Sequence, residues 1–429
     1  MMKQAHWKKQ LMAALTGGFL MLHTVSAFAA PIELSLEESI ARALQNNPAI
    51  KIADSSRQEA EYEIKIAKGD KLPQLTMTHS DSRINDGSST SNTFKNQIGL
   101  GMNLYTGGRV EGAIEKAKIG LKVADLDVEK SKQQIKLDAT NGYFTILQTR
   151  NTVKVDQESV DQMAAHLKNV EAQYNVGTVA KSDVLRSQVE LANNQQVLTK
   201  AQNAYEIAVS NLNNVMGLPL NTEIQIKDEL VHEPYNLSLE DSIAYAMNNR
   251  PEAIQADHNI DIAKQSVKIA KGGKLPTVSA SAAKNWEDDN FPGSDDNGWS
   301  VGLTATWTPF DSGVTNAKIK QSNSAVEKSL QTAKQTKDAV QLEVRQAYLN
   351  MVEAEKRIST SQVTVEQADE DFKIAQVRYS AGVGTNTDVI DAQVALTQAK
   401  NNYIQAMYDF NTSKANLTKA MGVPVETVK

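Results

Sequence analysis

Few side chains in this sequence have the type and spacing that chemistry requires. The chain of 429 residues has no cysteine, which excludes structural disulfides, thiolate metal sites, thiol nucleophiles and a lipid-modified N-terminal cysteine. Its six histidines are scattered without metal-ligand spacing, and the glycine-rich segment 381–384 lacks the strand-then-helix context of a phosphate-binding loop. The sequence therefore predicts no enzyme activity, no metal site and no cofactor.

One pair of aspartates has a spacing that could bring two carboxylates together. Asp388 and Asp391 are three residues apart, so on a helix both carboxylates lie on the same side. They are either an ordinary solvated first turn, in which acids stabilise the helix dipole, or members of acidic rings that favour cations when several copies assemble. The residues alone favour the first interpretation.

Composition excludes several classes of protein. Hydrophobic residues make up 41% and charged residues 22%, and the mean hydropathy is -0.41. After residue 30 no run of 18 apolar residues exists to span a bilayer as a helix. With 45 basic and 51 acidic residues the net charge is -6, so the general basic footprint of a nucleic-acid partner is missing.

The first 29 residues predict a secretory signal peptide. Three lysines precede an apolar stretch at residues 11–22, which is too short to span a membrane, and small residues at Ala27 and Ala29 predict cleavage after Ala29. The mature protein is therefore expected to be exported.

The remainder of the chain is a tandem duplication. The segment LSLEESI at 34–40 recurs as LSLEDSI at 237–243, an offset of 203, and Met216-Gly217 recurs as Met421-Gly422, an offset of 205. One net insertion of two residues, between positions 73 and 108, separates two otherwise colinear halves. The predicted divisions are a first repeat at 30–219, a linker or equatorial segment at 220–236 and a second repeat at 237–429.

Each repeat contains a long stretch without proline in which apolar residues recur every seven positions, as at Val184, Leu191 and Leu198. A strict seven-residue period of apolar residues indicates helices packed side by side in a supercoil. Glycines at 177 and 382 interrupt the pattern and permit tight reversals. The predicted helices are 108–173 and 180–216 in the first repeat, and 313–378 and 385–421 in the second. The longer ones would extend about 100 Å.

Before each long helix the period changes from helical to two. Trp299, Val301, Leu303, Ala305 and Trp307 alternate with small polar residues, which is typical of strands in an outer-membrane β-barrel with interfacial aromatics at both ends. A soluble β-hairpin over a core is the alternative. The predicted strands are about 73–84 and 94–106, then 276–286 and 299–309.

Four strands cannot close a membrane barrel, because the smallest such barrels have eight. An open sheet edge in lipid would leave backbone groups unpaired. Oligomerisation is therefore required, although two, three or four chains would each satisfy the strand count.

The order and spacing of several loose motifs, found twice, resemble the TolC family of outer-membrane efflux proteins (outer-membrane factors). The resemblance covers essentially the whole mature chain. The motifs that carry it are LSLEESIA at 34–41 with NNP at 46–48, KLP at 71–73, YTGGR at 105–109, YNVGT at 174–178, YSAG at 379–382, DVID at 388–391, MGLP at 216–219 and MGVP at 421–424.

This resemblance implies an α+β membrane protein: a homotrimer with a 12-stranded outer-membrane β-barrel, four strands per chain, that continues into a long periplasmic α-helical coiled-coil barrel. The linker, the chain ends and short helices starting near Glu37 and Glu240 would form a small mixed equatorial belt. The implied activity is passive export of drugs, other small molecules or proteins. The implied partners are outer-membrane lipid, a periplasmic adaptor (membrane fusion protein) and an inner-membrane transporter of RND, ABC or MFS type.

The resemblance also assigns roles at the helix tips. Asp388 and Asp391 would form acidic rings that constrict the pore, and with the resemblance this interpretation is favoured over the simple first turn. Tyr379 and Asp183 match positions of a bond network between helix pairs, and the arginine expected in the second tip is replaced by Gly384. A weaker or differently latched closed state follows as a hypothesis.

Two glycines and two tryptophans are further candidate site residues. Gly177 and Gly382 are turn glycines that would also contact the adaptor, and Trp299 and Trp307 would lie at the two membrane interfaces. Two alternatives to the duct are a periplasmic coiled-coil adaptor and a structural envelope protein without a pore. An adaptor would need lipoyl-like and β-barrel modules, and it would lack two hairpins per chain of period two.

Overall fold

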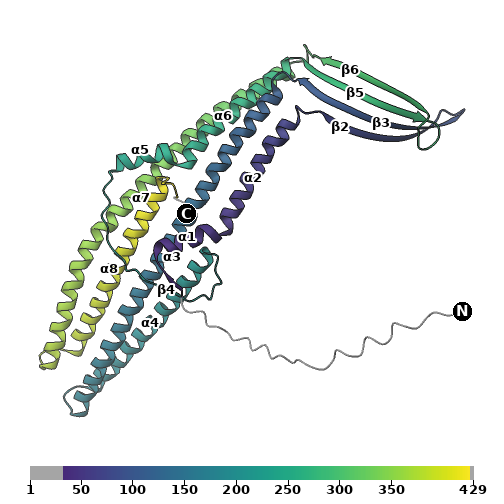
Figure 1. Ribbon diagram of the computed structural model, residues 1–429. Coiled ribbons are helices and arrows are strands. Elements are labelled where there is room, and N and C mark those ends of the chain that lie inside the picture. The colour runs from purple at the N-terminus through teal and green to yellow at the C-terminus, as the bar shows by residue number, and fades with distance from the viewer. Residues whose placement is uncertain (1–31, 426–429) are drawn as a thin grey trace, which may run out of the picture.

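The computed structural model describes residues 32–425, so the predicted signal peptide at 1–29 lies outside the described residues. The molecule is elongated, with a β-sheet at one end and the free tips of two helical hairpins at the other (Figure 1). In the part of the chain that is described, no helix combines the length and apolar character needed to cross a membrane.

Eight α-helices make up most of residues 32–425. They are α1 (Leu36–Asn46), α2 (Pro48–Gly69), α3 (Arg109–Asn175), α4 (Lys181–Val215), α5 (Leu239–Asn249), α6 (Pro251–Lys271), α7 (Val314–Ser380) and α8 (Asn386–Ala420). The two longest, α3 and α7, have 67 residues each, which corresponds to about 100 Å. Near the sheet they pack against α2 and α6, and toward the tips they pack against α4 and α8.

Helices α2 and α6 were not expected from the sequence. The belt was predicted to contain only short helices starting near Glu37 and Glu240, whereas each of these short helices is followed, after one kink, by a helix of more than twenty residues. Proline at the first position of α2 and α6 explains the kink, because proline has no N–H to donate but fits the first turn of a new helix.

The residue before each of these prolines ties the kink to the end of another helix. In the first repeat the Asn47 side-chain amide donates to the carbonyl of Val215, the last residue of α4, at 2.9 Å. In the second repeat Arg250 Nη1 donates to the carbonyl of Ala420, the last residue of α8, at 2.8 Å. Each contact satisfies a carbonyl that a helix end leaves without an intrahelical partner.

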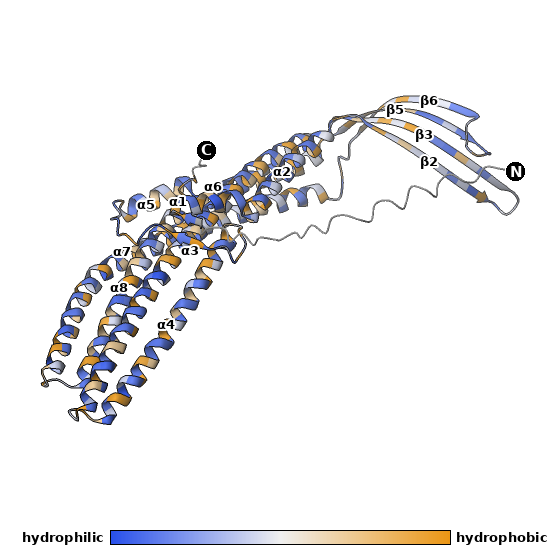
Figure 2. Cartoon of the chain, turned by 60° about the horizontal axis from the view of Figure 1, so that its bottom comes forward, coloured by the Kyte–Doolittle hydropathy of each residue, from blue (hydrophilic) through white to orange (hydrophobic). Residues whose placement is uncertain are grey.

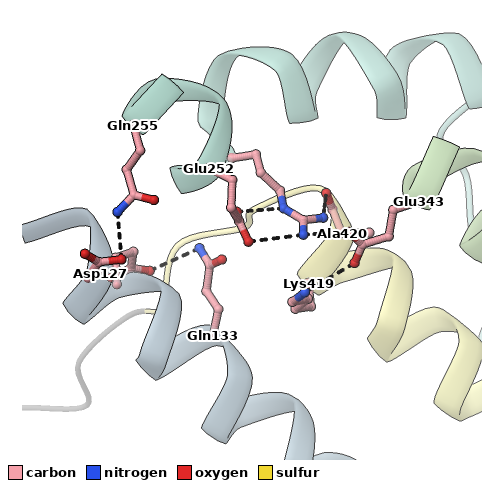
Figure 3. Close-up of polar contacts among 9 residues, drawn as sticks. Asp127, Gln133, Glu252, Gln255, Glu343, Lys419 and Ala420 are labelled. Carbon is pink, nitrogen blue, oxygen red and sulfur yellow. Dashed lines mark hydrogen bonds and ion pairs between the residues drawn. The ribbon is translucent and has the colours of Figure 1, made fainter. Parts of the chain in front are cut away.

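Arg250 is the centre of a buried ion cluster (Figure 3). Its side chain is only 4% exposed, and it contacts Glu252 Oε2 at 2.9 Å and Glu343 Oε2 at 2.7 Å. Lys419 Nζ contacts the other oxygen of Glu343 at 3.2 Å. A buried guanidinium requires such partners, because an unpaired charge in the protein interior is strongly destabilising.

Four antiparallel strands form one sheet in the order β2-β3-β5-β6, and β2 and β6 are its edges. The strands are β2 (Gln74–Asn85), β3 (Thr90–Tyr105), β5 (Thr277–Asp288) and β6 (Asp296–Thr306). Large apolar side chains remain exposed on it: Met77 is 78% exposed and Trp299 is 77% exposed. Figure 2 shows hydrophobic and hydrophilic segments mixed along the strands.

The strand ends differ slightly from those predicted. Strand β6 ends at Thr306, so Trp307 lies just beyond it, where its indole N–H donates to the Lys274 carbonyl at 3.1 Å. Strand β3 begins at Thr90, four residues before the predicted start, because β3 pairs with β2 through Asn85–Thr90. A slip of a few residues at element ends is normal, since ends fray and pattern alone does not define them.

The belt lies midway along the helices. Two short parallel strands, β1 (Ile32–Leu34) and β4 (Ile224–Ile226), pair beside α3. There the Tyr143 hydroxyl, fully buried in the core of the first repeat, donates to Asp228 Oδ2 at 2.5 Å. Phe410 occupies the corresponding core of the second repeat. Both aromatic side chains therefore serve packing at the level where the linker crosses the helices.

Candidate functional site: the tips of the helical hairpins

Two turns connect the helices at the end of the molecule opposite the sheet (Figure 1). The turn between α3 and α4 contains Gly177, and the turn between α7 and α8 contains Gly382. Both glycines have a positive φ, +80° and +78°, which side chains rarely adopt, and both are exposed with open space around them. The turns thus require glycine and present bare backbone to solvent.

Asp388 and Asp391 are exposed on the first two turns of α8 and line one shallow groove with Asp371 and Arg378 of α7. Asp388 also closes the helix start: Thr385 N–H donates to its Oδ2 at 2.9 Å, and its own N–H donates to Thr385 Oγ1 at 3.1 Å. These contacts with Thr385, helped by the charge of Arg378, lower the pKa of Asp388. Asp388 is therefore both a helix cap and an ionised wall of the groove.

Tyr379 and Asp183, which match positions of the bond network, are not hydrogen-bonded to each other. The Tyr379 hydroxyl is buried and has no hydrogen-bond partner among the described residues. Burial and the nearby charge of Asp183 raise the pKa of this tyrosine. The two residues are thus neighbours across the hairpins without a direct hydrogen bond, and their part in a bond network between helix pairs stays a prediction.

A different polar cluster joins the hairpins, and no motif in the sequence indicated it. The Asn386 side chain is 4% exposed: its Oδ1 accepts from His166 Nε2 at 2.6 Å and from Ser187 Oγ at 3.2 Å, and its amide donates to the Asp183 carbonyl at 3.1 Å. Burial lowers the pKa of His166, whose ring also packs edge-on against Tyr379. Asn386 thus connects α8 to both helices of the first hairpin.

The cluster was missed because its members have no signature in the chain. His166 and Asn386 are 220 residues apart, and His166 lies within a heptad pattern whose neighbours are apolar. Only the duplication offered a signal: the position equivalent to Asn386 in the first repeat is Lys181, which is exposed. A polar residue in one repeat and a different type in the other marks a site where the two tips differ.

The sequence profile described as outer membrane efflux protein matches this chain twice, at residues 39–218 and 243–423. The chain belongs to the outer membrane efflux protein family. The two matches coincide with the two repeats, and together they cover most of residues 32–425 that form the fold described above. This match supports the outer-membrane efflux channel over the alternative of a periplasmic coiled-coil adaptor.

Individual relatives and solved structures support the same family assignment. Outer membrane protein TolC of Salmonella enteritidis is 24% identical over 398 residues, covering 88% of this chain and 79% of that protein. Alkaline protease secretion protein AprF of Pseudomonas aeruginosa is 22% identical over 446 residues, covering 97% and 89%. The crystal structure of the Campylobacter jejuni CmeC outer membrane channel superposes with a TM-score of 0.80 at 18% identity, covering 92% and 87%. The fold of these channels is therefore the fold of this chain.

Gly384 is the position at which this efflux protein departs from the expected arginine. Its N–H donates to the Arg378 carbonyl at 3.0 Å, so the turn folds back over the end of α7. A Cβ at this position would lie 3.0 Å from Tyr379 N and 3.1 Å from Arg378 C, closer than most real contacts. Instead, Arg186 of α4 donates to Thr387 Oγ1 of α8 at 2.7 Å, which supplies an arginine contact between the hairpins from the other side.

Proposed function

We propose that three copies of this outer-membrane efflux channel assemble into one passive exit duct. The observation that carries the proposal is the four-stranded sheet with two free edges and an exposed apolar face, set at one end of helices about 100 Å long. Twelve strands from three chains would close a barrel and leave no edge in lipid. The apolar face would contact the membrane, and the face with Gly99, Gly101 and Ser281 would line the pore.

In this arrangement the aromatic residues Trp299 and Trp307 mark the two membrane interfaces. They are eight residues apart, which corresponds to about 26 Å of extended backbone, with Trp299 in β6 and Trp307 just beyond its end. Both side chains are more than half exposed, as residues that anchor in lipid headgroups would be. The signal peptide proposed at 1–29 would direct the chain to the envelope, and the segment 220–236 would form the equatorial belt between the repeats.

The helical tips would form the gate at the periplasmic end. Around a threefold axis Asp388 and Asp391 would form two rings of three carboxylates, which select for cations and narrow the pore. Asp388 supports this role because its contacts keep it ionised while it lines the groove. Tyr379 and Asp183, packed between the hairpins, would resist their separation.

The exposed turns at Gly177 and Gly382 would dock the helical hairpin of a periplasmic adaptor, which links the duct to an inner-membrane transporter. Exposure and bare backbone support docking, because an approaching helix meets no side chain there. AprF is named for protease secretion, so both small molecules and proteins are proposed as cargo. Susceptibility of a deletion strain to drugs, compared with its secretion of proteins, separates the two.

Fractionation of cells that express the full-length chain tests the proposal. The protein should be recovered with the outer membrane and should migrate as three chains after chemical crosslinking. Recovery in the soluble periplasm would contradict the duct and favour an adaptor. Recovery in the membrane as a monomer would contradict the shared barrel.

A further inference from the structure

Between the belt and the tips, four helices form a row whose outer members are α4 and α7. Helix α3 packs against α4 on one side and against α8 on the other, and α8 packs in turn against α7. Figure 2 shows α7 and α4 at opposite sides of this row. In this part of the molecule each inner helix thus packs along two long neighbours, and each outer helix packs mainly along one.

The duplication indicates what belongs on the free flank of each outer helix. Tyr143 of α3 corresponds to Tyr348 of α7, an offset of 205, and the same offset relates Met421 after α8 to Met216 after α4. The contact between α3 and α8, which joins the two repeats, therefore has a counterpart between α7 and α4. These two helices are at opposite sides of the row, so only α4 of a second copy can supply that counterpart to α7.

Apolar side chains on the outer helices are exposed where their counterparts on the inner helices are covered. On α7, Leu349 is 51% exposed, whereas its counterpart Phe144 on α3 is partly buried and packs against the core of the first repeat. On α4, Leu185 is 52% exposed, whereas its counterpart Ile390 on α8 is 7% exposed. Because burial of apolar surface is favourable, a neighbouring helix on each free flank would stabilise the assembly.

One polar contact between α3 and α8 has a charged counterpart. Gln148 Nε2 donates to Gln405 Oε1 at 3.2 Å, and the equivalent positions are Glu353 on α7 and Lys200 on α4. Lys200 is exposed, and among the described residues it forms no ion pair. The Glu353 side chain is 60% exposed and pairs only with Arg357 on its own helix. Both charges are therefore available to a second copy.

A second pair has the opposite polarity. Thr140 of α3 and Asn411 of α8 line one cavity within the chain, and their counterparts are Arg345 on α7 and Glu206 on α4. Both of these charged side chains are exposed. Each outer helix thus carries one acid and one base, placed so that unlike charges face each other across the boundary.

A neutral pair lies between the two charged ones. Thr145 Oγ1 and the Tyr408 hydroxyl are 3.2 Å apart within the chain, and their counterparts Asn350 and Asn203 are amides that can exchange a hydrogen bond. The three pairs follow one another in opposite directions along the two helices: Arg345, Asn350 and Glu353 on α7, and Glu206, Asn203 and Lys200 on α4. Antiparallel helices pair in this order.

The boundary within the chain carries a different charge pattern. There Lys400 Nζ contacts Glu158 Oε2 at 2.8 Å, and the equivalent positions on α4 and α7 are Gln195 and Val363, which are neutral. The ion pairs of the two boundaries therefore lie at different positions. Such a difference lets α7 distinguish α4 of a second copy from α8, because each wrong pairing leaves charges without partners.

We propose that α7 of one copy packs along α4 of a second copy, with Glu353 paired to Lys200 and Arg345 paired to Glu206 across the boundary. The inference rests on the proposed duct, and it adds which helix surfaces meet and which charges select them. Charged pairs at an interface contribute more to the choice and orientation of the partner than to affinity. These two pairs would thus define how far α4 and α7 slide along each other.

Crosslinking of introduced thiols tests the contact, because the natural chain has no cysteine. K200C/E353C, made as the full-length protein and treated in the membrane with a short bis-maleimide, should form covalent oligomers that end at the number of chains in the ring. The matched control is Q148C/Q405C, which places thiols at the equivalent positions within one chain. It should react to the same extent but migrate as a single chain. K200C alone and E353C alone should also remain single chains.

Charge reversal tests the ion pair itself. E353K and K200E should each speed the exchange of subunits between labelled and unlabelled assemblies by about fivefold or more, because like charges would face each other. E353K/K200E restores unlike charges and should return the exchange rate to within about twofold of the parent. E366K is the control, since Glu366 is exposed on α7 and its counterpart Asp161 contacts only Gln157 of its own helix. It should exchange as the parent does.

The possible failures of the two proposals are distinguishable. An intact assembly in which K200C/E353C stays a single chain, while Q148C/Q405C reacts, would overturn this interface and leave the duct standing. The same exchange rate in E353K, in E353K/K200E and in the parent would overturn the ion pair. Chains that fold but do not assemble would contradict the shared barrel, and with it the duct.

Discussion

The two repeats meet the same structural need at their kinks with different chemistry. Asn47 and Arg250 each donate to the carbonyl of the final residue in the last helix of their own repeat, Val215 of α4 and Ala420 of α8. Asn47 does so with a neutral amide, whereas Arg250 brings a buried charge that Glu252 and Glu343 must balance. The comparison shows that duplication conserves a geometric contact more readily than the side chain that makes it.

The largest expected effect comes from removing the charged version of this contact. R250M should lower the free energy of unfolding by about 3 kcal/mol, because Glu252 is left partly buried without its partner. The value falls at the lower end for such pairs, since the Glu343 side chain is 45% exposed. The matched variant N47A should cost only about 1 kcal/mol, typical of a lost cap and hydrogen bond.

Urea unfolding of both variants at one protein concentration measures this difference, because subunit assembly makes apparent stability concentration-dependent. Equal losses in R250M and N47A would show that the ion cluster adds nothing beyond the shared contact with the helix end.

The pH dependence of stability sharpens the same comparison. Burial raises the pKa of Glu252, and its hydrogen bond and attraction to Arg250 more than offset this, so the pKa is lowered. A carboxyl whose folded pKa is lowered contributes stability above its unfolded pKa of about 4.3, and that contribution is lost as the pH falls through the folded value. The urea midpoint should therefore fall on acidification below about pH 5.

E252Q tests the source of this decline, because it removes the titrating group. Its midpoint should fall less steeply with acidification than that of the parent protein. Identical pH profiles for E252Q and the parent would assign the acid sensitivity to other carboxylates.

The tips offer the next comparison, between Asn386 and its counterpart Lys181. N386A leaves His166, Ser187 and the Asp183 carbonyl without a partner, and we expect a loss of about 1 to 3 kcal/mol at the second tip. K181A removes an exposed side chain and should change stability by less than about 0.5 kcal/mol. Hydrogen exchange at the start of α8 should accelerate in N386A only. Equal exchange rates in both variants would show that the Asn386 side chain does not hold the two hairpins together.

The smallest effect concerns the helix starts. Thr385 and Asp388 form a reciprocal cap on α8, whereas α4 begins at Ala180 without a side-chain cap although Asp183 occupies the matching third position. T385A should therefore destabilise α8 by about 1 kcal/mol. A180T should stabilise α4 by a fraction of that, as Asp183 completes the cap. The thermal midpoint should fall in T385A and rise in A180T. A shift in the same direction in both variants would contradict the proposed difference between the two helix caps.

The sequence predicted the helices, turns and strands that leave a local, repeating pattern of residues. Heptads such as Val184, Leu191 and Leu198 indicated the long helices, glycines at 177 and 382 placed their turns, and alternation around Trp299 to Trp307 indicated the strands. These signals are reliable because the period of apolar residues follows from helix and strand geometry.

Contacts between distant segments could not be predicted in this way. Helix α2 was missed because it has no heptad stripe, and Ile52 and Ile66 on it are exposed in the chain described. The link between His166 and Asn386 joins residues in different repeats, so no local pattern contains it. The part of Tyr379 and Asp183 in a bond network stays a prediction, because a resemblance of positions does not define side-chain geometry.

The measurement that tests the central claim most directly is single-channel conductance of the purified full-length protein in planar lipid bilayers. We expect discrete, cation-selective channels, and D388N/D391N should reduce the cation selectivity because it neutralises six carboxylates in a trimer. A folded trimer that produces no channels would contradict the duct. Channels whose selectivity is unchanged in D388N/D391N would contradict the gate at the tips.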